Sequence, residues 1–209
     1  MSLIPPTKKD FEMVEPGMHK ARCIKVVDMG TQETEFKGAT QLKHKIMIMF
    51  ELPQTEMQEG ENAGKPFAIA LFVTLSLDKK SNLRPLLVSW RGKDFTEDEA
   101  ANFDMLNLLN ATALVNVIHN KKDDNTYANI AAIMPLKQNE CPARINPLVA
   151  FSLNDFDQEV FDSFSDKMQA KIMASPEYKE IMNPTIDAEA EFGNQDVDKD
   201  DDEPFESQF

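Results

Sequence analysis

Basic side chains alternate with apolar ones along two segments of the sequence, residues 19–28 and 42–52. Lysine and arginine at every second position of a strand project from one face of a sheet. Cations along such a face neutralise the phosphates of a nucleic acid strand, and exposed aromatic rings beside them stack on its bases. The sequence therefore predicts a basic, ring-bearing groove for single-stranded nucleic acid. Its candidate residues are Lys20, Arg22, Lys25, Phe36, Lys37, Lys43, Lys45, Phe72, Arg91, Lys93, Lys121, Lys122 and Tyr127.

Each of these residues also has a purely structural interpretation. Strand lysines often serve solubility or protect a sheet edge from pairing with another chain. Phe72 falls in the polar register of its strand, so it is either exposed for stacking or covered by helices that follow later in the chain. Tyr127 either stacks on a base or pairs across a hairpin. Arg91 and Lys93 either contact phosphate or lie in a solvated turn.

No catalytic motif is recognisable in the sequence. GENAGKP at residues 60–66 is one residue shorter than a phosphate-binding loop, and Pro66 stands where a magnesium-binding hydroxyl is needed. The three histidines have no nucleophile near them in sequence, and carboxylate pairs are concentrated at residues 185–209, where nothing holds them in register. Cys23 and Cys141 lack metal-ligand or disulfide spacing and are expected to be buried thiols. We therefore expect a protein that is not an enzyme and uses no metal or cofactor.

Five strands are predicted to position the basic and aromatic residues. The alternation of apolar and polar side chains places strands at 19–28, 42–52, 66–77, 112–119 and 126–134. The last two are separated by the turn NKKDDN and form a hairpin.

Two helices are predicted between the third and fourth strands. Leu83, Leu87 and Trp90 recur at helical spacing before Gly92, which is a typical helix stop, and Ser81 is the candidate N-cap. Trp90 is expected to pack in the core. A second helix begins at the sequence Thr-Glu-Asp-Glu of residues 96–99, which has the pattern of a capping box.

The order of three strands, helices and two strands is that of an OB fold. Strands this short satisfy their edge hydrogen bonds best by closing on themselves. We therefore expect a mainly β protein with a five-stranded OB-fold-like barrel, while a split two-layer α+β sheet accommodates the same elements. In an OB fold the loops at residues 30–38 and 120–125 flank the ligand groove.

The chain is expected to contain four regions. They are an extended lead-in at residues 1–16, the OB-fold domain at 17–136, a helical appendage at 137–184 and a disordered acidic tail at 185–209. Within the appendage, Ser165 and Ser175 are expected N-caps, and Pro176 takes the first position of the second of these helices.

Most of the negative charge belongs to the predicted tail. Residues 185–209 contain ten acids and one lysine, a charge of −9, and the other 184 residues contain 26 acids and 21 bases, a charge of −5, which together give the net −14. A disordered −9 segment can occupy a cationic groove until nucleic acid displaces it, and its end is then exposed to a partner protein. The residues expected to bind that partner are Asp200, Asp201, Asp202, Glu203, Pro204, Phe205 and Phe209. A solubilising end without a partner is the alternative.

The sequence resembles bacterial and bacteriophage single-stranded DNA-binding proteins. DDDEPF at residues 200–205 is similar to the acidic Pro-Phe tip of the bacterial proteins, although ESQF follows it here. LRPLLVSWRGKDFTEDEAANFDMLNLLNATALVNVIHN at residues 83–120 resembles proteins of tailed phages. The resemblance covers roughly residues 16–136 and part of the helical region, and it transfers no individual contact residue. It implies an OB fold that coats single-stranded DNA in phage replication or recombination, and a tail that recruits enzymes of those processes.

Two functions therefore compete. The first is a non-enzymatic protein that coats single-stranded DNA and recruits replication or recombination proteins. The second is an interaction module that binds such a protein, with its acids mimicking DNA. No apolar stretch approaches the roughly 18 residues that cross a bilayer, and charges and prolines occupy the first 17 residues, so we expect a cytoplasmic protein, in the host cell if a phage encodes it.

Overall fold

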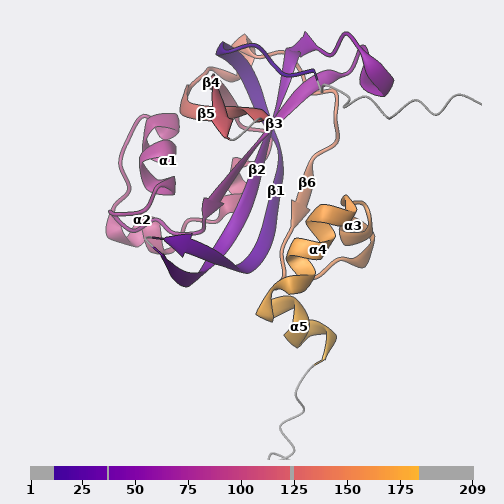
Figure 1. The fold of residues 1–209 in the computed structure, drawn as a ribbon. Helices are drawn as coiled ribbons and strands as arrows, with labels where there is room; N and C mark the ends of the chain where they lie inside the picture. Colours follow the sequence, from indigo (N-terminus) through magenta and orange to yellow (C-terminus); the bar gives the residue numbers. More distant parts are fainter. Residues whose placement is uncertain (1–11, 37, 123–124, 184–209) are drawn as a thin grey trace, which may run out of the picture.

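The computed structural model describes residues 12–36, 38–122 and 125–183 of the 209-residue chain (Figure 1). The strands are β1 (Gly17–Phe36), β2 (Ala39–Glu56), β3 (Pro66–Thr74), β4 (Thr112–Lys122), β5 (Asn125–Pro135) and β6 (Val149–Phe151). The helices are α1 (Leu83–Arg91), α2 (Glu97–Ala101), α3 (Gln158–Asp162), α4 (Asp166–Ala174) and α5 (Pro176–Met182), with short 3-10 turns at Gly60–Asn62, Met105–Leu108 and Gln138–Glu140. The protein is mainly β, as predicted.

The six strands form one sheet in the order β3-β2-β1-β4-β5, and β6 pairs with β1. All pairs are antiparallel except β1 with β6. Within the described residues no ladder joins β3 to β5, so the sheet is open. The predicted order of elements along the chain, three strands, helices and two strands, is confirmed, but the closed five-stranded barrel is not.

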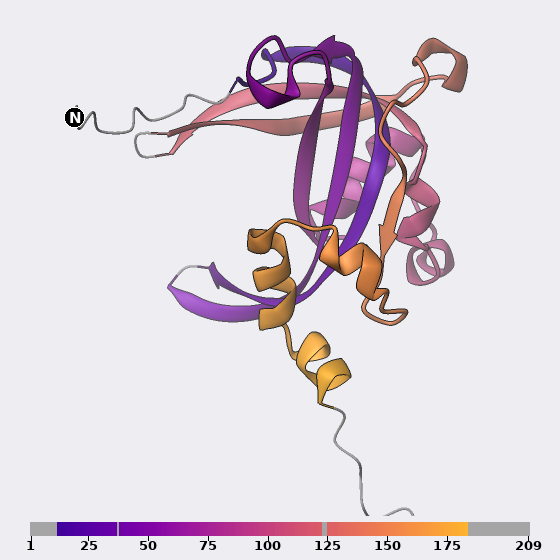
Figure 2. The same cartoon turned by 90° about the vertical axis from the view of Figure 1, so that its right-hand side faces the viewer.

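Two long hairpins extend the sheet beyond the predicted strands. The first two predicted strands are the N-terminal half of β1 and the central part of β2, and most of the predicted loop at 30–38 is paired strand. A register shift between Asp28 and Gly30 bends β1, and Gly30 has φ +65°, which glycine adopts readily. The β1–β2 and β4–β5 hairpins extend toward the same side of the molecule, the left of Figure 2.

The face of the sheet that we call inner packs against α1. Val26, Ile48 and Phe50 belong to this core, and the Trp90 ring lies 5.2 Å from the Phe50 ring, centroid to centroid. The indole Nε1 donates to the Thr112 carbonyl oxygen at 2.7 Å, which confirms the predicted core position of Trp90.

The predicted stop of α1 and the predicted cap of α2 are found, but the N-cap of α1 lies one residue after the predicted Ser81. Gly92 closes α1 with φ +74°, and the Ser81 hydroxyl accepts a hydrogen bond from the Arg84 N–H, although Asn82 is the N-cap residue. Thr96 and Glu99 form the predicted capping box of α2.

The face that we call outer is covered by the C-terminal segment. Val27, Met29 and Met47 alternate with inner-face residues and pack against Phe151, Leu153, Phe161, Phe164 and Ile172. Figure 1 shows α3, α4 and α5 on the side of the sheet opposite α1 and α2. Ser165 is the N-cap residue of α4, and Ser175 caps α5 by accepting from the Tyr178 N–H. None of the helices in the described part of the chain is long and apolar enough to span a membrane.

Candidate nucleic-acid interface

Phe72 lies at the border between the covered and the open part of the outer face. Its cross-strand partner Met47 is buried among the C-terminal residues, whereas the Phe72 side chain is 55% exposed. The Nζ of Lys171, in α4, lies 5.3 Å from the centroid of the Phe72 ring. The C-terminal helices therefore flank this ring and leave more than half of it accessible.

A small cavity of about 170 Å³ opens beside the Phe72 ring. It is lined by Met29, Phe72, Ser165, Lys167, Met168 and Lys171. The cavity thus combines an aromatic face and two thioether side chains with two amines. A nucleic acid base stacks on such a ring, and amines close to the ring pair with the adjoining phosphates.

Two further cations lie on the outer face of β2. Lys43 and Lys45 share this face with Met47 because side chains alternate along a strand. Lys45 donates from Nζ to the Thr74 hydroxyl at 2.8 Å, and Thr74 is on the Phe72 face of β3. Loss of hydration lowers the pKa of Lys45, and the charge of Lys43 lowers it further. An anion bound between these amines would relieve that repulsion.

The cationic surface continues past Thr74 into a larger open cavity. Its volume is about 560 Å³, and its lining includes Lys43, Thr74, Ser76, Lys80 and Ser81 together with one acid, Asp78. Amines and hydroxyls are the side chains that hydrogen-bond phosphate oxygens. We call the surface formed by Lys43, Lys45, Phe72, Lys167 and Lys171 the Phe72 surface.

Arg22 is a correction to the predicted groove. It lies on the outer face, but only 5% of it is exposed. Its guanidinium donates to the carbonyl oxygens of Pro142 and Cys141 at 3.1 Å each, and to the carbonyl and side-chain oxygens of Asn110 at 3.3 Å. The alternation gave the correct face, but it did not show that the segment after β5 folds back over this residue. Arg22 holds that segment in place and is not available to phosphate.

Glu51 fixes the same segment from the adjacent strand. It pairs with Arg22 in the sheet register, is fully buried, and accepts hydrogen bonds from the backbone N–H groups of Ile145 and Asn146 at 2.7 Å. Lys20 and Lys25 are partly exposed on either side of Arg22, and Lys25 lies beside β6. The covering segment therefore occupies the part of β1 where the sequence predicted an open row of cations.

Arg91 and Lys93 are not part of the Phe72 surface. They belong to the end of α1 and the turn that follows, on the opposite side of the sheet. Both pair with Glu99, at 3.2 Å from Arg91 Nη2 and 3.1 Å from Lys93 Nζ, and the Arg91 guanidinium lies 3.9 Å from the centroid of the Phe95 ring. The hydrogen bond from the Thr96 N–H, together with these cations, lowers the pKa of Glu99 to about 2. The structure therefore favours a structural role for both basic residues.

The remaining candidates lie on the two hairpins or outside the described residues. Lys121 and Tyr127 are exposed near the end of the β4–β5 hairpin, with Tyr127 in register with Asn120. Lys37, the side chains of Phe36 and Lys122, and the tail residues Asp200, Asp201, Asp202, Glu203, Pro204, Phe205 and Phe209 lie outside the part of the chain that the structure describes.

Lys167 and Lys171 are site residues that the sequence analysis missed. They are four positions apart in α4 and so project from one side of the helix. That spacing was a visible signal. Its significance depends on the packing of α4 beside β3, which no local pattern predicts.

The described residues contain neither a clustered metal site nor an exposed thiol. Within the described residues, no three His, Cys, Asp or Glu side chains are grouped to hold a metal ion. Cys23 and Cys141 are free and buried, as predicted. Burial raises the pKa of Cys23 to about 12.

Comparison with known proteins does not assign this chain to a family. A scan against models of protein families finds no match, and a search of curated proteins finds none either. A function therefore has to be argued from the geometry of the chain itself.

Proposed function

We propose that the protein binds single-stranded nucleic acid on the Phe72 surface. The observation that supports this proposal is an aromatic ring, 55% exposed, with an amine 5.3 Å from its centroid and a small cavity beside it. Each base stacked on an aromatic side chain contributes about 1 to 3 kcal/mol. The lysines around the ring add contacts to phosphate that carry no sequence preference.

The exposed bases of a single strand suit this surface better than a duplex does. A base can stack on Phe72 only if its own face is free, and bases in a duplex are already stacked and paired. The ring stands on a strand of the sheet, between lysines of β2 and α4. A duplex meets only the lysines of such a surface, so its binding lacks the stacking contribution.

The proposal includes an OB-type barrel as the finer description of the fold. The strand order and the helices between β3 and β4 match that fold, and residues of β3 and β5 approach within 8 Å, Cα to Cα. The β1–β2 and β4–β5 hairpins would then flank the ligand groove, as the corresponding loops of OB folds do. Tyr127 and Lys121 on the second hairpin extend the proposed contacts.

The tail supplies the second half of the proposed function. Residues 185–209 have a charge of −9, which complements the lysines of the Phe72 surface. We propose that nucleic acid displaces the tail, and that Pro204 and Phe205, or Phe209, then recruit a protein of replication or recombination. This role, and coating of DNA in a phage context, rest on the sequence resemblance.

A competition assay tests single-strand binding. A fluorescently labelled oligo-dT is bound at low salt and followed by anisotropy, and unlabelled oligo-dT or a duplex of the same length is added. Trp90 is a poor reporter because it is buried in the inner core. We expect the single strand to compete at a much lower nucleotide concentration than the duplex. Equal competition would show that binding is only electrostatic and would contradict the role of Phe72.

The excess of acids supports a second candidate. A chain with net charge −14 can imitate DNA toward a basic protein, which is the interaction-module alternative. That module would bind no oligo-dT even after removal of the tail. The two proposals therefore give opposite results when oligo-dT is titrated with the chain that lacks the tail.

A further inference from the structure

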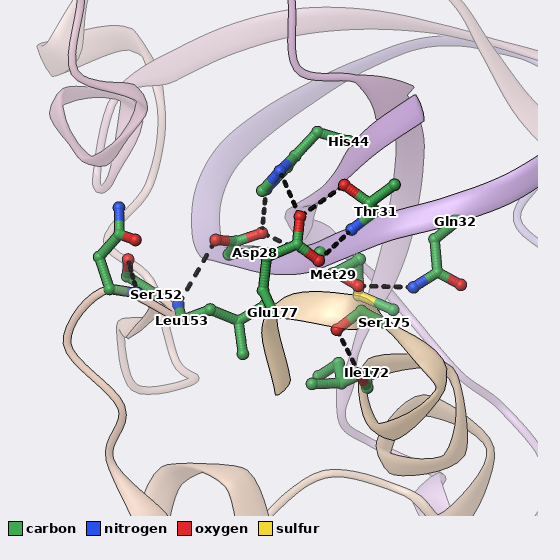
Figure 3. A network of polar contacts seen from close by, with 12 residues as sticks. Asp28, Met29, Thr31, Gln32, His44, Ser152, Leu153, Ile172, Ser175 and Glu177 are labelled. Carbon is green, nitrogen blue, oxygen red and sulfur yellow. Dashed lines mark hydrogen bonds and ion pairs between the residues drawn. The ribbon is translucent and has the colours of Figure 1, made fainter. Parts of the chain in front are cut away.

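His44 lies between two carboxylates at the base of the β1–β2 hairpin. Its Nε2 is 2.6 Å from Asp28 Oδ1, and its Nδ1 is 3.4 Å from Glu177 Oε1 (Figure 3). The three side chains come from β2, β1 and α5. Figure 3 shows the imidazole directed into the space between the two acids. This cluster therefore joins the hairpin to the last helix of the structure.

Glu177 attaches α5 to the hairpin through β1 as well. Its carboxylate accepts from the Thr31 N–H at 2.9 Å and from the Thr31 hydroxyl. Asp28 in turn accepts from the Gly30 N–H at 2.9 Å. The imidazole thus connects two carboxylates that are each fixed by the backbone of β1.

The junction between α4 and α5 is seated on the same part of β1. Ser175 is fully buried, and a Cβ placed on Gly30 would lie 2.5 Å from the Ser175 Cβ, so the two backbones approach closely here. Gln32 donates from Nε2 to the carbonyl oxygen of Lys171 at 2.9 Å. The residue whose amine lies beside Phe72 is therefore held at its backbone by the hairpin.

Only a protonated imidazole satisfies both acids. A neutral imidazole has one N–H donor, whereas imidazolium has two, one for each carboxylate. The hydrogen bond to Asp28 raises the pKa of His44, and the charges of Asp28 and Glu177 raise it further against the opposing effect of burial. Lys43 and Lys45 lie on the other side of β2, and Lys179 and Glu180 of α5 are exposed.

We propose that Asp28, His44 and Glu177 form a proton-controlled latch that holds α5, and with it α4, on the β1–β2 hairpin. In this role the three are positioning residues, because they keep Lys171 beside Phe72 without touching a ligand. The latch itself is independent of the proposed function. Its effect on nucleic acid affinity rests on that function.

The direction of the pH effect follows from the three groups. Because the pKa of His44 is raised on folding, its contribution is complete below the unfolded value of about 6.5 and is lost as pH rises through the folded pKa. Burial works against ionisation of Asp28 and Glu177, but hydrogen bonds, from His44 and from Thr31 respectively, outweigh it and lower both pKa values. Their contribution is lost only as pH falls through these lowered values. The latch is therefore closed in mildly acid to neutral solution and opens on the alkaline side.

Hydrogen exchange of the full chain without nucleic acid tests the latch. Protection of the α5 amides, corrected for intrinsic exchange, is measured from pH 6 to pH 9, and the His44 pKa is measured by NMR. We expect α5 protection to fall about tenfold for each unit by which that pKa exceeds 6.5. His44→Gln should lack this dependence. His19→Gln, a control histidine that contacts the Glu15 carbonyl and Thr55, should retain it.

A second variant guards against a general folding defect. Glu177→Gln removes one charge while keeping the shape of the side chain, and it should lower the His44 pKa and weaken the pH dependence of α5. Wild-type protection that does not change with pH, or that changes equally in His44→Gln, would overturn the latch.

Oligo-dT affinity measured over the same pH range separates the latch from the proposed nucleic acid binding. Affinity that falls in parallel with α5 protection supports positioning of Lys171 by the latch. Loss of α5 protection with constant affinity would contradict that positioning role. Absence of any oligo-dT binding would overturn the proposed function, and hydrogen exchange alone would then decide whether the latch exists.

Discussion

Lys171 in α4 and Phe72 in β3 meet at 5.3 Å, from the lysine Nζ to the centroid of the ring. The two residues are far apart in the sequence, and the C-terminal helices bring them together across the outer face of the sheet. A cation beside an exposed ring is attracted by the ring face, and it is also placed to pair with a phosphate next to a stacked base. This pair is the centre of the proposed interface.

Replacement of Phe72 should weaken nucleic acid binding with little effect on stability. Phe72→Ala removes one stacking platform, so the Kd for oligo-dT should rise about 5- to 150-fold. The ring is 55% exposed, so the free energy of unfolding should change little. Phe72→Trp should retain binding because the indole also stacks.

Ile145→Ala is the matched control, since Ile145 is 62% exposed and does not line the Phe72 cavity. Equal Kd values for Phe72→Ala and wild type would exclude stacking at this site.

Replacement of Lys171 should change the salt dependence of binding. The slope of log K against log salt becomes shallower by about 0.7 for each phosphate of a single strand that no longer pairs with a cation. Lys171→Ala should therefore bind less tightly at low salt and show a shallower slope in anisotropy titrations. Lys93→Ala is the control because Lys93 pairs with Glu99 near α1. A slope unchanged in Lys171→Ala, or reduced equally in Lys93→Ala, would place the phosphates elsewhere.

Arg22 is expected to contribute to stability and not to ligand contact. Arg22→Ala leaves the carbonyl oxygens of Pro142 and Cys141 without their donor, so the free energy of unfolding should fall by about 2 to 4 kcal/mol. Lys20→Ala, on the same strand and partly exposed, should change it by less than about 0.5 kcal/mol. Urea denaturation followed by circular dichroism measures both. An Arg22→Ala protein as stable as wild type would show that these hydrogen bonds do not hold the covering segment.

Cys23 should resist alkylation in the folded protein. Burial raises its pKa to about 12, so the reactive thiolate is scarce at pH 8 and the sulfur is inaccessible. Treatment with iodoacetamide followed by mass spectrometry should leave Cys23 unmodified in native protein and modify it fully in urea. Rapid native labelling would mean that the inner core opens easily.

Local patterns predicted the strands, the hairpin and most helix caps. Alternation identified part or all of each strand from β1 to β5, and the capping box at Thr96 and Glu99 was recognised directly, because these signals lie within a few adjacent residues. The end of β1 and both ends of β2 were missed, and in β1 the reason is that residues 31–35 are polar on both faces and give no alternation. Closure of the barrel stays a prediction.

The candidate site was predicted only in part because its cover is built from distant residues. Alternation placed Arg22 on the correct face, but its partners Cys141 and Pro142 are more than 100 positions away. A similar separation in sequence explains why Lys167 and Lys171 were missed. These residues of α4 join Phe72 at the surface, whereas the segment that contains Cys141 and Pro142 covers Arg22. A strand pattern tells which way a side chain points, and it does not tell what lies above it.

One titration tests the central claim most directly. Labelled oligo-dT is titrated at low and physiological salt with the full chain, with a chain truncated after Asn183, and with the truncated chain carrying Phe72→Ala. Removal of the −9 tail should tighten binding, most at low salt, where charges are least screened, and Phe72→Ala should weaken it again. A truncated chain that binds no oligo-dT at low salt would contradict the proposed interface and favour the interaction module.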